Sequence, residues 1–222
     1  MQENVLITKS KENVISLYMT KVYFLLAISF IPTIVTIFFL KDKINYFKEA
    51  HPTSLLLLGC LAVILCFVLI YLIKIFNDSN LSYLFLMLFT ALNGAIMTPV
   101  IGMYLKSSAG TEILFQAMTL TFIVFIGMSL LSIFVKNVSF LGQFLFVGLI
   151  SLIVVSIFNL FFQSTLLQSV LSGVGAILFS LFILYDTKNA SENTNISPVV
   201  PVLQLYLDIV NLFLSILDLI KR

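Results

Sequence analysis

Seven long apolar stretches run along this chain, separated by short polar segments. A helix needs about 20 apolar residues to cross a bilayer, and each stretch meets that length. Each of the seven is followed directly by a charged or strongly polar residue. The pattern therefore predicts seven membrane-embedded helices, at residues 22–40, 54–73, 81–105, 113–135, 140–162, 166–185 and 199–220.

The polar segments leave no room for a second domain. Residues 1–21 form a polar N-terminal tail, and we expect residues 22–222 to form a single membrane domain. The first apolar run is too long for the h-region of a signal peptide and lacks a clear cleavage site. We therefore expect it to stay in the membrane as a helix.

The last apolar stretch carries a polar stripe. Asp208, Asn211 and Ser215 are spaced i, i+3 and i+7, so they share one face of a helix. Such a face belongs against protein or water rather than lipid. We therefore place the seventh helix at the centre of the bundle, and the sequence leaves open whether it crosses completely or only re-enters.

Small residues mark two contacts between helices, and one of the two stripes is Ser172, Ala176 and Ser180. Gly94, Thr98 and Gly102 recur every four residues, and small residues let helices approach closely in lipid, where packing drives association. We expect Gly94 and Gly102 to lie at a helix contact. Pro32 and Pro99 lie inside apolar runs, where each removes a backbone hydrogen bond and is expected to kink its helix.

Composition agrees with a membrane protein. Sixty per cent of the 222 residues are hydrophobic and only 10% are charged, too few to cover a soluble domain of this size. The expected fold is thus all-α and integral to a lipid bilayer. The net charge of +2 comes without any basic run, so we expect no nucleic-acid partner.

Orientation is undecided by charge if all seven helices cross. The twelve Lys and Arg residues then divide six and six between the two sides of the membrane. If the last helix only re-enters, Lys221 and Arg222 change sides and the count becomes eight against four. That arrangement favours a cytoplasmic N-terminus.

Two carboxylates are the strongest candidates for a functional site. Asp186 ends the sixth run at the membrane edge, and Asp208 lies about two turns, roughly 10 Å, in from the same edge, so a long hairpin and a modest tilt would be needed to bring them together. Two carboxylates in one apolar site cannot both ionise cheaply, so the pair is expected to share a proton. Loss of that proton would leave two charges that repel, and a hard cation such as Ca²⁺ could bind transiently between them.

The remaining inventory argues against most enzymes and cofactors. The sole histidine, His51, lies in a loop, and there is no phosphate-binding glycine loop. Asp218 has Lys221 at i+3 and is interpreted as one half of a surface ion pair. One remote enzyme hypothesis remains, an intramembrane aspartyl protease, although that family's Gly-x-Gly-Asp signature is absent before Asp208. We therefore expect neither an enzyme nor a cofactor.

Three motifs resemble one family closely. These are residues 139–149, residues 177–188 ending in Leu-Tyr-Asp-Thr-Lys, and residues 205–214 beginning Leu-Tyr-Leu-Asp. They resemble the Bax inhibitor-1 (transmembrane Bax inhibitor motif) family, and residues 91–99 resemble its third-helix motif more loosely. The likeness covers roughly residues 20–220.

The resemblance implies both a fold and a function. Six helices would surround a hydrophobic seventh, and the protein would be a pH-sensitive calcium leak with Asp186 and Asp208 as its sensor. Family members also modulate cell death in eukaryotes, and bacterial members resemble partners of a membrane-bound AAA protease. Members thought to close by an arginine latch carry that arginine in the second helix, but this chain has no arginine before Arg222.

Two functions therefore stand side by side. The first is a calcium leak channel, with calcium as the permeant ion, gated by the two aspartates and supported by the polar residues Asn211 and Ser215. The second is a regulatory membrane protein that binds a membrane protease or a cell-death or stress partner. The short tail favours a bacterial inner membrane. The sequence does not give ion selectivity, physiological partner or oligomeric state.

Overall fold

The structure is a computed structural model, and it describes residues 2–50, 52–77 and 79–221. Within these ranges, the side chains of residues 2–11, 45–50, 52 and 56 are not described. Two residues considered above, His51 and Arg222, lie outside the described residues.

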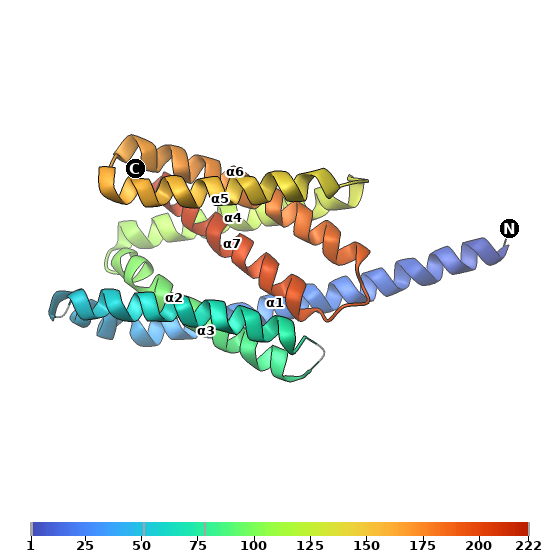
Figure 1. The fold of residues 1–222 in the computed structure, drawn as a ribbon, viewed down its shortest axis with the longest axis horizontal. Coiled ribbons are helices and arrows are strands. Elements are labelled where there is room, and N and C mark those ends of the chain that lie inside the picture. The colour runs from blue at the N-terminus through green and yellow to red at the C-terminus, as the bar shows by residue number, and fades with distance from the viewer. Residues whose placement is uncertain (1, 51, 78, 222) are drawn as a thin grey trace. The chain divides into compact units, whose positions relative to one another are not determined.

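Every regular element of these described ranges is an α-helix (Figure 1). The order along the chain is α1 Gln2–Ala50, α2 Pro52–Ile75, α3 Leu81–Tyr104, α4 Ser108–Phe134, α5 Ser139–Phe162, α6 Thr165–Glu192 and α7 Val199–Ile220. The predicted bounds of the seventh helix are confirmed, and those of the third and fifth differ by one residue. The first helix is much longer than its apolar core, because it also includes most of the polar tail.

Helix α6 continues past the predicted end of its apolar run. The expected helix stops at residue 185, but α6 runs on to Glu192 and leaves only residues 193–198 before α7. Its last turns contain no Gly or Pro, and Lys188 pairs with Glu192 at i+4, 3.4 Å apart. The change from apolar to polar residues thus marked a change of environment, not the end of the helix.

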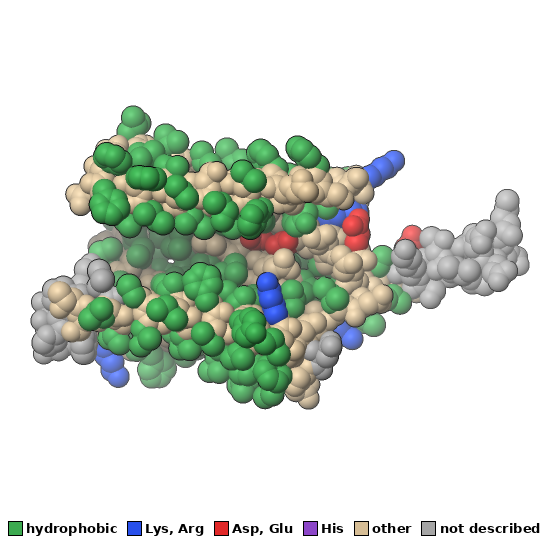
Figure 2. Space-filling view, in the orientation of Figure 1, with side chains coloured by type: hydrophobic (Ala, Val, Ile, Leu, Met, Phe, Trp, Pro, Cys, Tyr) green, Lys and Arg blue, Asp and Glu red, His purple; other side chains and the backbone are tan. Residues whose placement is uncertain are grey.

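All seven helices of the described chain are long and apolar enough to cross a membrane. On the face seen in Figure 2, hydrophobic side chains predominate along the helices and charged ones are few. Helix α7 differs from the rest. Over its most apolar stretch 56% of the residues are buried, against 33% or less in every other helix. Such burial suits an interior helix, as its polar stripe predicts.

The chain divides into two compact units. One comprises Met1–Thr111 with Thr194–Leu203, and the other Glu112–Asn193 with Gln204–Arg222. In the first unit, α3 packs against both α1 and α2. The expectation of a single membrane domain stays a prediction.

The contact between α1 and α3 is very close at Gly94. A Cβ atom at this glycine would lie 2.6 Å from the backbone oxygen of Thr33 and 2.9 Å from its Cα. One turn away, the Thr33 hydroxyl donates a buried hydrogen bond of 2.9 Å to the carbonyl oxygen of Thr90. Backbone can approach backbone here only because Gly94 has no side chain. Gly102, two turns further along α3, is also buried.

In the second unit, a tight turn joins α5 to α6. Gln163 ends α5 with a positive φ of 49°, and Ser164 caps α6 by accepting a hydrogen bond of 3.2 Å from the backbone N–H of Leu167. The side chain of Asn159 accepts from the backbone N–H of Ser164 at 3.1 Å. The two helices are therefore packed side by side as an antiparallel pair (Figure 1).

Because the neighbour of Gly94 is backbone, even a methyl group should be costly there. We expect Gly94→Ala to lower the free energy of unfolding by about 1–3 kcal/mol, since α1 and α3 must move apart. Thermal unfolding in detergent measures the change. Gly127→Ala is the matched control, because a Cβ there meets no described atom within 4 Å outside its own helix. It should be neutral or stabilise by up to about 1 kcal/mol. Equal melting of the two variants would contradict the proposed contact.

Candidate functional site

A polar seam runs the length of α7 within the second unit. The spacing of Gln204, Asp208, Asn211, Ser215 and Asp218 is 4, 3, 4 and 3 residues, which places all five on one helix face. Four of them meet α6 directly, Ser215 through its hydroxyl group beside Gly175. Gln204 and Asp208 contact Asp186, and Asp218 contacts α6 near its N-terminal end. The seam is therefore the line along which the two helices pack.

Asp186 and Asp208 form the first contact of this seam. Their exposed fractions are 5% and 6%, so both carboxyl groups are shielded. The two carboxyl groups are close enough to interact through a side-chain hydrogen bond, and Gln204 Nε2 donates to Asp186 Oδ1 at 3.4 Å. A hydrogen bond between two carboxyl groups requires a proton on one of them. The structure thus brings the two predicted aspartates together in an arrangement that suits a shared proton.

The aspartate pair is incompletely satisfied. Asp208 Oδ2 is buried and receives no hydrogen bond from any described residue. The hydroxyl of Thr187, next to Asp186 in the chain, is also buried without a partner in the described part. An ionised oxygen left in this state is costly, because neither water nor a donor compensates its charge. A negative charge on Asp208 Oδ2 would therefore have no described donor beside it.

The length of α6 explains why the two aspartates meet. Asp186 lies six residues before the C-terminal end of α6, and Asp208 lies nine residues after the start of α7. At 1.5 Å per residue these are about 9 Å and about 14 Å along the two antiparallel helices. The short connection thus brings the carboxyl groups to similar heights without a long hairpin.

The neighbouring helix α5 fixes the position of this part of α6. A Cβ atom at Gly142 would lie 2.5 Å from the Tyr185 hydroxyl oxygen and 2.8 Å from Cζ, so the tyrosine ring rests on the glycine. Gly148, the next glycine along α5, leaves room in the same way for the side chain of Leu178 on α6. Since Tyr185 precedes Asp186, this packing restricts the rotation of α6 beside the aspartate pair.

Asn211 and Ser215 do not bond to the aspartates. Asn211 donates 2.8 Å to the carbonyl oxygen of Leu207, and Ser215 donates 2.8 Å to that of Asn211, so both bond to their own helix. Ser215 also faces Gly175, where an added Cβ would lie 2.8 Å from its hydroxyl oxygen. These two residues, predicted to support the aspartates, thus lie half-buried in the seam between the two carboxylate contacts and bond only to backbone of α7 in the described structure.

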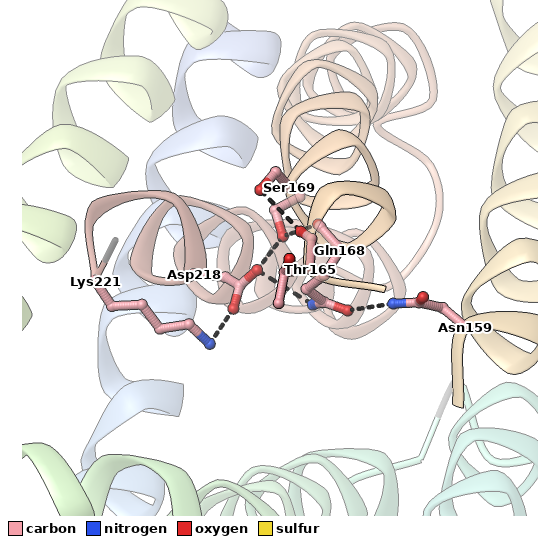
Figure 3. A network of polar contacts seen from close by, with 7 residues as sticks. Asn159, Thr165, Gln168, Ser169, Asp218 and Lys221 are labelled. Carbon is pink, nitrogen blue, oxygen red and sulfur yellow. Dashed lines mark hydrogen bonds and ion pairs between the residues drawn. The ribbon is translucent and has the colours of Figure 1, made fainter. Parts of the chain in front are cut away.

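Asp218 is the centre of a second polar cluster, near the C-terminal end of α7 (Figure 3). The predicted ion pair with Lys221 is confirmed. The other carboxylate oxygen, Oδ2, accepts hydrogen bonds from Ser172 and, at 3.2 Å, from Gln168, both on α6. Gln168 in turn accepts 3.1 Å from the side chain of Asn159 on α5. Asp218 therefore links three helices, which is more than a surface ion pair does.

Sequence reasoning missed the α6 side of this cluster. Gln168, Ser172 and Gly175 follow one another at i, i+4 and i+7, the same periodicity as the α7 stripe. The signal was present, because Gln204 and Asp218 extend the predicted Asp208 stripe in both directions. Matching the two stripes in antiparallel order would have paired Asp218 with Ser172.

Metal ligands are sparse in the described ranges. No group of three or more His, Cys, Asp or Glu side chains is placed there to hold a metal ion. The aspartate pair offers two carboxyl groups, whereas a protein site for Ca²⁺ commonly supplies six to eight oxygen ligands. Any calcium contact at Asp186 and Asp208 would thus need water or backbone oxygens as well.

Comparison with known proteins shows that one family matches nearly the whole chain. A family model described as "Inhibitor of apoptosis-promoting Bax1" matches residues 15–222. An uncharacterized protein of Helicobacter pylori is 41% identical over 145 residues, which are 65% of this chain and 63% of its own length. Bax inhibitor 1 of Schizosaccharomyces pombe is 31% identical over 187 residues, covering 83% of this chain and 67% of that protein.

A mammalian relative aligns over most of both chains. Protein lifeguard 4 of Mus musculus is 30% identical over 212 residues, 92% of this chain and 84% of its own length. The alignment with the Helicobacter pylori protein, by contrast, spans slightly less than two thirds of that relative.

The seam also predicts which positions lipid can reach. In a background with Cys60→Ala and Cys66→Ala, we expect Asn211→Cys and Ser215→Cys to react weakly with a lipid-soluble thiol reagent, because both side chains lie against protein. Ile177→Cys on α6, whose native side chain is 66% exposed, should react strongly. Labelling in liposomes measures the difference. Strong reaction at position 211 or 215 would show that this stripe faces lipid.

Proposed function

Because the chain belongs to the Bax inhibitor-1 family, we propose that it is a pH-sensitive calcium leak, gated by a proton that Asp186 and Asp208 share. The observation that carries this proposal is the contact between two buried carboxyl groups, one of which leaves an oxygen without a donor. Its seven apolar helices make the chain a multi-pass membrane protein. Gating, by contrast, depends on the chemistry of the pair.

The proposed closed state is the protonated one. A shared proton forms a hydrogen bond that holds α7 against α6, and it leaves a single negative charge between two side chains. When the pH rises, that proton is lost and two anions face each other in an apolar surrounding. Their repulsion opposes the α6–α7 contact, so calcium flux should rise as the pair ionises.

Calcium is a suitable permeant ion for such a gate. A divalent hard cation relieves the repulsion between two carboxylates, and oxygen is the ligand type that it prefers. Two carboxylates alone bind it weakly, which suits passage rather than storage. We propose no catalytic step and no cofactor for this site.

The proposed location is a bacterial inner membrane with a cytoplasmic N-terminus. Bacterial relatives support the first part. The second part rested on a re-entrant last helix, and α7 is long and apolar enough to cross the membrane completely. The accessibility of single cysteines at the two ends of α7 would show whether this helix crosses the membrane or re-enters. If it crosses, the Lys and Arg residues divide six and six between the two sides, and if it re-enters they divide eight and four.

A second candidate function is regulation by binding. The printed descriptions "Inhibitor of apoptosis-promoting Bax1" and "Bax inhibitor 1" name inhibitors and not channels. On this alternative the chain engages another membrane protein, such as a membrane-bound AAA protease or a cell-death or stress factor, and calcium flux is incidental. Purified protein in liposomes separates the two, because flux without any partner supports the leak.

The pH dependence of flux tests the gate directly. We expect wild-type flux into liposomes loaded with a calcium dye to rise between mildly acidic and mildly alkaline pH. Asp186→Asn and Asp208→Asn should each lose this dependence, because neither pair can then carry two negative charges. The double variant should behave like the single ones, since the two residues act as one unit.

Glu112→Gln is the control for this experiment. Glu112 is an exposed acid near the start of α4, bonded to Gln116 at 3.5 Å, and its loss should leave the pH profile unchanged. A wild-type pH profile in both single aspartate variants would show that the pair is structural and that the gate lies elsewhere.

A further inference from the structure

The two carboxylate contacts of the α6–α7 seam are chemically different. Asp218 has donors on both of its oxygens, from Lys221 on one and from Ser172 and Gln168 on the other. Charge-assisted hydrogen bonds of this kind are strong and suit an anion. Asp208, in contrast, has a buried oxygen without any donor among the described residues. One contact is therefore suited to be permanent and the other to be broken.

The two contacts are far enough apart along α7 for the Asp218 cluster to determine how the helix is placed at the Asp186–Asp208 pair. Asp208 and Asp218 are ten residues apart on one face of α7, which is about 15 Å along the helix axis. A helix attached at a single point can still rotate and slide against its neighbour. A second attachment at this distance fixes both its rotation and its register.

The packing between the two contacts allows only a narrow range of registers. Gly175 of α6 lies between Ser172 and Asp186, and it receives the hydroxyl of Ser215. A shift of α7 by one turn would place another side chain over the glycine and separate Asp218 from its donors. The attachment at Asp218 and the fit at Gly175 thus select the same register.

We propose that Asp218, held by Gln168 and Ser172, is a positioning residue that sets the register of α7 and thereby places Asp208 opposite Asp186. The effect on helix register stands on the geometry alone, whereas the effect on calcium flux rests on the proposed function. We call the cluster of Asp218, Gln168 and Ser172 the anchor. Gln168 also accepts a hydrogen bond from Asn159, so α5 supports the anchor.

Among the described side chains, the charged groups beside Asp218 are different from those beside the Asp186–Asp208 pair. Among described side chains, Asp218 faces the charge of Lys221 on its own helix and the uncharged Gln168 and Ser172 on α6. Asp186 and Asp208 face each other and the uncharged Gln204. Lys188 on α6 is paired with Glu192. A change at Asp218 should therefore reach the aspartate pair through register and not through direct charge interaction.

Disulfide trapping can read the register. An ideal Cβ at Gly175 lies 3.7 Å from the Cβ of Ser215, within the range of about 3.5–4.5 Å that a disulfide needs. In the Cys60→Ala, Cys66→Ala background, Gly175→Cys with Ser215→Cys should cross-link rapidly in the membrane. Gly175→Cys with Asn211→Cys probes a register shifted by one turn and should cross-link slowly.

Removing the anchor should change this ratio. We expect Asp218→Asn and, independently, Gln168→Leu to lower the preference for the 175–215 pair over the 175–211 pair by about tenfold, as loss of a hydrogen bond to a charged group would. Glu192→Gln, which removes another ion-paired acid from α6, should leave the ratio unchanged. The same anchor variants without engineered cysteines should show a flattened pH profile of calcium flux.

The outcomes separate the two proposals. An unchanged cross-linking ratio in both anchor variants overturns the positioning role, whatever the flux does. A changed ratio with a wild-type flux profile supports the register and overturns its effect on the aspartate pair. A changed ratio in a protein whose wild-type flux does not depend on pH supports the anchor and refutes the proposed gate.

Discussion

A polar side chain within an apolar helix must find its partner inside the protein, because lipid offers none. Helix α7 carries five such side chains on one face, and this constraint determines how the second unit is built. Asp208 meets Asp186, and Asp218 meets Ser172 and Gln168. Asn211 and Ser215 bond to their own backbone. The seam with α6 follows from these requirements, whereas the most buried side chains of α7 are apolar ones outside the stripe, such as Leu205, Tyr206 and Leu212.

Glycine makes these polar contacts geometrically possible. Hydrophobic burial does not drive helices together in lipid, so contact depends on close packing and on hydrogen bonds. At Gly175 the α7 serine fits against α6, at Gly142 a tyrosine ring fits against α5, and at Gly94 backbone approaches backbone between α1 and α3. In each case a Cβ atom would lie within 3 Å of its neighbour. The glycines and the polar stripes thus act as parts of the same packing.

Much of this architecture could be predicted from the sequence, because long apolar runs and a 3–4 spacing of polar residues are direct signals of membrane helices and their buried faces. Seven helices and the Asp186–Asp208 neighbourhood follow from them. The continuation of α6 to Glu192 does not, since polar residues such as Lys188 and Asn189 are compatible with both a helix and a loop. The contacts of Asp218 with Gln168 and Ser172 were also missed, because they depend on the register between two helices and join residues that are 50 and 46 positions apart in the sequence. The pattern on one helix gives no register until it is matched with the polar stripe on the neighbouring helix.

The contrast between the two carboxylate contacts shows how one residue type can serve two purposes on one helix. Charge on Asp218 is stabilised by donors that remain in place, so its proton affinity is of no use for switching. The Asp186–Asp208 pair has only the neutral Gln204 as a described donor, and Asp208 Oδ2 has none, so a second charge on the pair is poorly compensated. A helix that had only the second kind of contact would lose its register whenever the pair opened. On the two proposals made above, the first contact would let α7 separate from α6 at Asp208 and return to the same register, which a reversible gate requires.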